Sequence, residues 1–184
     1  RETGGLVNIQ ATNAPHMLFS EDNVVAKFNH NKSQWGLFYN LSARNFKKTY
    51  TDIDETYVLE NKTIHRVQEG LHDQNKHFTH NIDLSYNLTE QDKYVFNVVF
   101  RNSVYDAPCL NQSNKLYDAA DADNYIFSRL KNKQSSYTPS LDLYYQRTLP
   151  KNQMLTMSVT GTLMHTDNNR LYHEYTPQAE DLAM

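Results

Sequence analysis

The sequence of 184 residues has one cysteine, Cys109, and only five glycines and five prolines. A single cysteine excludes an internal disulfide framework, so we expect Cys109 to be an unpaired loop residue. The net charge of -3 provides no basic surface for nucleic acid. The mean hydropathy is -0.76, and no apolar run approaches the roughly 18 residues of a membrane-spanning helix. Membrane-crossing β-strands are still compatible with the sequence, because they show only alternating hydrophobicity.

Aromatic residues are abundant, with 13 tyrosines and 8 phenylalanines, and the longest regular pattern covers residues 78–101. Apolar and polar residues alternate up to Leu88, which predicts a β-strand with one apolar face. The segment Thr89–Asp92 is expected to reverse the chain. The return half alternates again, except at Val95 and Val99. Each arm has roughly ten residues, the length of a tilted membrane-crossing strand, and aromatic residues near both ends are typical of the membrane–water interfaces.

Further alternating segments predict additional strands at residues 5–12, 23–29, 34–44, 140–149 and 155–163. The predicted connections are short at 30–33, 89–92 and 149–152, and long at 45–77, 102–135 and after 165. Such alternation is typical of transmembrane barrels, which combine tight periplasmic turns with long extracellular loops. Segment 45–77 is expected to hold strand extensions and a loop. Segment 102–134 is a second long polar region. Its part 111–127 is the least strand-like in the sequence, and a helical turn is expected near residues 116–121.

The sequence therefore predicts an all-β fold, an antiparallel up-and-down meander that forms a segment of a transmembrane outer-membrane β-barrel. The side chains expected to face lipid share one face of the predicted strands: Trp35, Leu37, Tyr39, Leu41, Ile82, Leu84, Tyr86, Leu88, Phe96, Val98, Leu155, Met157, Val159 and Leu163. The alternative is a soluble, secreted β-sandwich that binds a carbohydrate or protein ligand, with the same aromatic stripes forming a buried core.

The first residues carry a more specific signal. Gly4–Ile9, GGLVNI, resembles the segment of TonB-dependent outer-membrane receptors where the plug ends and the first barrel strand begins, and N-L-S/T sequences follow at Asn40 and Asn87. The resemblance implies that residues 1–5 end a plug and that 6–184 form the first barrel strands and loops. A complete barrel of this family has about twenty-two strands, against roughly seven here, so we expect a segment of a longer polypeptide.

The resemblance also implies a function, in the bacterial outer membrane. A nutrient would bind to the extracellular loops and pass through a barrel energised by a TonB-type complex, which would act through parts outside this chain. Expected partners are outer-membrane lipid, that energy-transducing complex and a surface lipoprotein, without nucleic acid. No enzymatic activity and no cofactor are expected.

Aromatic residues in the long loops are the candidate ligand contacts, because a tyrosine ring can stack on a ligand. They are Tyr50, Tyr57, Tyr105, Tyr117, Tyr125 and Tyr172. No Ser-His-Asp or Cys-His arrangement predicts a catalytic site. Two groups of possible metal ligands fit no compact motif, and we therefore predict no metal site. These groups are His65, His72, His77 and His80, and Asp118, Asp121 and Asp123.

Overall fold

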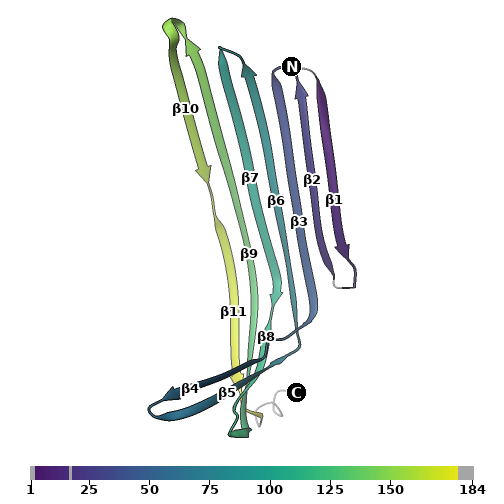
Figure 1. The fold of residues 1–184 in the computed structure, drawn as a ribbon, viewed down its shortest axis with the longest axis vertical. Helices are drawn as coiled ribbons and strands as arrows, with labels where there is room; N and C mark the ends of the chain where they lie inside the picture. The colour runs from purple at the N-terminus through teal and green to yellow at the C-terminus, as the bar shows by residue number, and fades with distance from the viewer. Residues whose placement is uncertain (1–2, 17, 178–184) are drawn as a thin grey trace. The chain divides into compact units, whose positions relative to one another are not determined.

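The computed structural model describes residues 3–16 and 18–177, and nearly all of them lie in β-strands (Figure 1). The strands are β1 (Gly4–Ala14), β2 (Phe19–His30), β3 (Ser33–Thr49), β4 (Ile53–Leu59), β5 (Lys62–Leu71), β6 (Asp73–Glu90), β7 (Tyr94–Leu110), β8 (Gln112–Asp118), β9 (Asp121–Leu149), β10 (Gln153–Thr162) and β11 (His165–Tyr175). A short 3-10 turn, η1 (Pro150–Asn152), joins β9 to β10. In this part of the chain, no helix has the length and hydrophobicity needed to cross a bilayer.

The described strands pair in the order β1-β2-β3-β6-β7-β9-β8-β5-β4, while β10 and β11 both pair with β9. The sheet is antiparallel, which confirms the predicted all-β antiparallel class. The chain divides into two compact units. Unit 1 consists of Arg1–Arg44, Phe78–Asp106 and Ser135–Asp167, and unit 2 consists of Asn45–His77, Ala107–Gln134 and Asn168–Met184.

Unit 1 is an up-and-down meander in which β1, β2, β3, β6, β7, β9 and β10 follow one another across the sheet (Figure 1). These strands correspond to the predicted strand segments. The three short turns are also confirmed, with the predicted turn at 89–92 displaced to residues 91–93. Each contains one residue with a left-handed backbone: Asn31 (φ 52°), Asp92 (φ 61°) and Lys151 (φ 66°). Asn and Asp tolerate this conformation better than most side chains.

The long connections contain more strand than the sequence predicts. The expected extensions of β3 and β6 are present. In the chain segment that connects these two strands, β4 and β5 form a hairpin. The long connection expected at 102–135 is wrong, because β7, β8 and β9 fill this region. The helical turn expected at 116–121 is also wrong: Asp118 pairs with Asp121 across a tight turn, where the Ala120 amide donates to the Asp118 carboxylate at 2.9 Å.

Region 102–134 forms strands because its backbone groups find hydrogen-bond partners in neighbouring strands. β8 pairs with β5 on one side and with β9 on the other, so its backbone groups are satisfied without an alternating apolar face. Cys109 likewise lies in β7 and not in a loop, and its thiol donates to the Gln74 carbonyl at 3.0 Å.

The partner of β9 is interrupted at one point. β10 ends at Thr162, opposite Ser140, and β11 begins at His165. The interruption falls beside Pro139, whose carbonyl accepts a hydrogen bond from the Leu163 amide at 3.0 Å. Proline has no N–H to return a second bond, so the ladder is weakened where the strand breaks.

Candidate functional site

Unit 1 has one face formed mainly by apolar side chains, here called the apolar face. Residues opposite each other in an antiparallel pair share a face. Val7 is therefore on the same side as Ala26 and Leu37, its partners along β1, β2 and β3. In β9 and β10, Val159 is paired with Leu143 in the same way.

Side-chain contacts extend the apolar face across the central strands. The Trp35 ring of β3 lies 4.3 Å from the Tyr86 ring of β6, centroid to centroid, and Tyr86 lies 6.3 Å from Phe96 of β7. Tyr39 and His80 also meet on this face, with 2.8 Å between the hydroxyl oxygen and the ring nitrogen Nδ1. The face therefore continues from β3 through β6 to β7.

The side chains predicted to face lipid fall on this face by register, contact or strand alternation: Trp35, Leu37, Tyr39, Leu41, Ile82, Leu84, Tyr86, Leu88, Phe96, Val98, Leu155, Met157 and Val159. Leu163 is also predicted to face lipid, but it lies in the interruption between β10 and β11. Many of them are open to the surroundings: Trp35 is 57% exposed and Leu84 is 43% exposed. The only buried hydrophobic side chains in the described residues are Ala26 and Ala107, so unit 1 has almost no internal core.

The opposite face of unit 1 carries a row of hydrogen-bonded polar side chains. Asn40 donates to Asn23 at 2.8 Å, Asn81 donates to Asn40 at 3.2 Å, and Ser103 donates to Asn81 at 2.8 Å. The row crosses β2, β3, β6 and β7. Unit 1 thus presents one apolar face and one face with a connected polar network.

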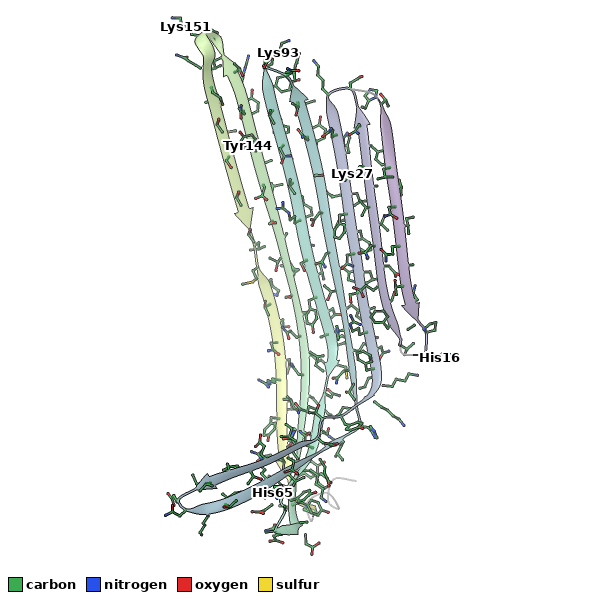
Figure 2. All side chains as sticks on the ribbon, viewed as in Figure 1. His16, Lys27, His65, Lys93, Tyr144 and Lys151 are labelled. Atoms are coloured by element: carbon green, nitrogen blue, oxygen red, sulfur yellow. The ribbon has the colours of Figure 1, made fainter. Side chains whose placement is uncertain are left out.

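Charged residues gather at the short-turn end of unit 1, where Lys93 and Lys151 are labelled in Figure 2. Glu90, at the end of β6 and beyond the apolar stripe, pairs with Lys93 at 2.8 Å and with Lys32 at 2.9 Å. The hydrogen bonds from Lys93 and Lys32 lower the pKa of the Glu90 carboxyl to about 2. This carboxylate joins two neighbouring turns.

Unit 2 contains a pocket of about 520 Å³. Its walls come from β6 through Asp73 and Asn75, from β8 through Ser113 and Asn114, and from β9 through Asn132. Ser113 donates to one Asp73 carboxylate oxygen at 3.0 Å. Asp73 Oδ2, Asn114 Oδ1 and Asn132 Oδ1 are buried and have no hydrogen-bond partner among the described residues. The pocket is therefore rich in unused acceptor oxygens.

The segment between β3 and β4 forms another part of the pocket wall, and Gly70 of β5 lets it approach closely. A Cβ atom at Gly70 would lie 2.5 Å from the Thr51 backbone nitrogen. The Gly70 amide also donates to the Asp52 carboxylate at 2.8 Å. Gly70 is opposite Asn114, which in turn is opposite Ser128, and both of these polar side chains are buried. The missing side chain of Gly70 thus makes room for Thr51.

The six tyrosines proposed as ligand contacts come from several different elements. Tyr50 lines the pocket, is 60% exposed and meets the His72 ring edge-on at 5.2 Å. Tyr57 lies in the β4–β5 hairpin, Tyr105 in β7 and Tyr172 in β11, so the loop placement predicted for these three is wrong.

Tyr117 and Tyr125 do meet, although they also lie in strands, β8 and β9. They are opposite each other, and Lys115 Nζ lies 4.8 Å and 4.5 Å from their ring centroids. Tyr117 donates to Glu69 at 2.6 Å, and this bond raises the pKa of the Tyr117 phenol. Both rings therefore already have partners inside the protein, namely the Lys115 ammonium group and, for Tyr117, the Glu69 carboxylate.

The histidines and aspartates considered as metal ligands are dispersed. His65 pairs with Asp54, while His72 contacts Tyr50 and His80 contacts Tyr39. Within residues 3–16 and 18–177, no group of three or more His, Cys, Asp or Glu side chains is arranged to hold a metal ion. Sequence reasoning missed the pocket, because Asp73, Asn114 and Asn132 are isolated polar residues without a recognisable spacing.

No protein-family model, curated protein or solved structure matches this chain.

Proposed function

We propose that this chain is a membrane-embedded segment of an outer-membrane transport receptor resembling the TonB-dependent receptors. In this proposal, the apolar face of unit 1 contacts outer-membrane lipid, and the segments of unit 2 contribute to binding a nutrient. The remaining parts of such a receptor, including those that contact the TonB-type complex, would lie outside this chain.

The observation that carries the proposal is the exposed apolar face of unit 1. An isolated soluble domain rarely leaves a contiguous apolar surface of many large side chains uncovered. On the paired strands β1–β2–β3 and β9–β10, charged residues of this face lie toward the strand ends, at Asp22 and Arg147. An apolar band with charges near its ends matches the cross-section of a bilayer, whose hydrocarbon core excludes charge.

The same face argues against a β-sandwich. A sandwich packs two sheets about 10 Å apart and buries the facing side chains between them. The described strands instead belong to one hydrogen-bonded sheet, and Trp35 and Leu84 remain substantially exposed. The turns after β2, β6 and β9 support lipid contact further, because these three short turns follow alternate strands of the unit 1 meander, as the tight turns at one end of a transmembrane barrel do. The connection between β1 and β2 is also short, with four residues.

The substitution Leu84→Arg tests lipid contact. A cationic side chain at the middle of a lipid-facing strand costs about 2–4 kcal/mol at the bilayer midplane. We expect the variant to show a reduced fraction of folded protein in isolated outer membranes, measured by fractionation and by heat-modifiable gel mobility.

The matched control is Asp83→Arg. It adds the same side chain to the same strand, but on the opposite face, because Asp83 has the alternation of Asn81 in the polar row. We expect Asp83→Arg to insert normally. Equal insertion of both variants, or release of the unmodified protein into buffer without detergent, would contradict lipid contact by the apolar face.

A further inference from the structure

The pocket of unit 2 has a chemical bias that its volume does not reveal. Among the described residues of its wall, Asp73 supplies the one carboxylate, and neither lysine nor arginine is present. The buried side-chain oxygens of Asp73, Asn114 and Asn132 lack partners among the described residues, and all three are hydrogen-bond acceptors. Asn114 is only 7% exposed. Burying unused acceptors costs free energy, so a ligand that supplies donors would be stabilised here.

Neighbouring hydrogen bonds hold these acceptors in place. Ser113 engages Asp73 Oδ1 and leaves the buried Oδ2 without a partner among the described residues. Thr49 donates to the Asp73 backbone carbonyl at 3.1 Å and accepts from Asn75 at 2.5 Å. The carboxylate is therefore positioned from two strands before any ligand arrives.

A primary ammonium group fits this arrangement. It has three N–H donors, no acceptor and a positive charge, whereas a hydroxyl brings lone pairs that would also need donors. A hydrogen bond between ammonium and carboxylate is roughly twice as strong as a neutral one. The volume of about 520 Å³ is in the range of small-molecule sites.

We infer that this pocket binds the ammonium group of an amine-bearing ligand, with Asp73 as the charged partner and Asn114 and Asn132 as neutral acceptors. The inference rests on the proposed function, in which the segments of unit 2 bind the transported nutrient. The exposed Tyr50 ring at the wall would add a cation–π contact to such a ligand.

Isothermal titration calorimetry on the purified full-length protein tests the inference. Cadaverine and a lysine-containing tripeptide serve as probes, and they distinguish a free amine from a peptide source. Pentanediol is the neutral counterpart of cadaverine, and glucose and calcium chloride represent the competing ligand classes. We expect at least one amine probe to bind at least tenfold more tightly than pentanediol.

Three variants test whether the carboxylate of the pocket determines the affinity for amines. Asp73→Asn removes the charge but keeps an acceptor for Ser113, and should weaken amine binding roughly tenfold. Asn132→Asp adds a second carboxylate and should strengthen it. Asp123→Asn, which removes a negative charge from an exposed position of β9 outside the pocket, should leave it unchanged. Circular dichroism of each variant checks that the fold is retained.

The remaining outcomes overturn the inference. Binding of glucose or calcium but neither amine probe would assign the pocket to another chemistry, and binding of no probe would remove its ligand role. Equal losses in Asp73→Asn and Asp123→Asn would reduce the effect to overall charge. The membrane test with Leu84→Arg is independent, so failure of amine binding with normal insertion rejects the pocket assignment alone.

Discussion

Replacing Gly70 by alanine should loosen the contact between β5 and the segment that precedes β4. The new Cβ would lie 2.5 Å from the Thr51 nitrogen and 2.7 Å from the Thr51 oxygen, whereas ordinary contacts begin at 3.4 Å. Thr51 would have to retreat by about 0.9 Å, the difference between the first and last of these distances. Both obstructing atoms belong to the backbone, so side-chain rotation cannot relieve the clash.

The expected cost combines two destabilising effects with one that offsets them. Overpacking of this kind costs about 1–3 kcal/mol, and weakening the bond from the Gly70 amide to Asp52 adds about 1 kcal/mol. Alanine reduces the entropy of the unfolded chain, which offsets about 0.4–1 kcal/mol. We therefore expect a net local destabilisation of about 2 kcal/mol.

Hydrogen exchange measured by mass spectrometry on β5 and β8 is the direct assay. A loss of about 2 kcal/mol corresponds to roughly 30-fold faster exchange of the amides that open with this contact. Gly161→Ala is the matched control, because a Cβ there would meet nothing within 4 Å. Unchanged exchange in Gly70→Ala would refute the close backbone approach as a structural requirement.

Two further substitutions probe turns. Glu90 has a folded pKa of about 2, below the ordinary value of 4.5, so its contribution is fully present above pH 4.5 and is lost as the pH falls through about 2. The Lys93 amide donates to the Glu90 backbone carbonyl at 3.1 Å, so its hydrogen exchange reports on this turn. Above pH 4.5 we expect this amide to be better protected from exchange in the unmodified protein than in the Glu90→Gln variant. The same pH dependence of protection in both proteins would contradict this. In the β4–β5 turn, Glu60 and Asn61 have left-handed backbones with φ of 48° and 66°. Glu60→Asn should stabilise that hairpin by up to about 1 kcal/mol, seen as slower exchange of its amides, and faster exchange would show that the Glu60 side chain makes a contact that matters more than its backbone strain.

The strands of unit 1 could be predicted because their sequence alternates with the period of the sheet. This worked even for β7, where Val95 and Val99 interrupt the pattern, since Phe96 still reaches Tyr86 on the apolar face. One apolar face is enough to fix the register of a strand, because a slip of one residue would move its apolar side chains to the polar face of the sheet.

Unit 2 was harder to predict for the opposite reason. Its strands carry polar residues on both sides, and β8 is stabilised by pairing with β5 and β9, which are distant in sequence. No local pattern records such pairing. The pocket depends on it even more, because Asp73, Asn114 and Asn132 come from three different strands. Their proximity is a property of the topology, and no spacing along the chain indicates it.

The meander of unit 1 also has a kinetic consequence. Most of its strands pair with a neighbour that follows after a few residues, so each hairpin can close with a small loss of chain entropy. Two closures are longer, from β3 to β6 and from β7 to β9. In the first of them, the β4–β5 hairpin can form by itself and shorten the effective loop between Thr49 and Asp73. Formation of this hairpin would bring Thr49 and Asp73 closer together before β3 and β6 pair, and so would lower the entropy cost of that closure.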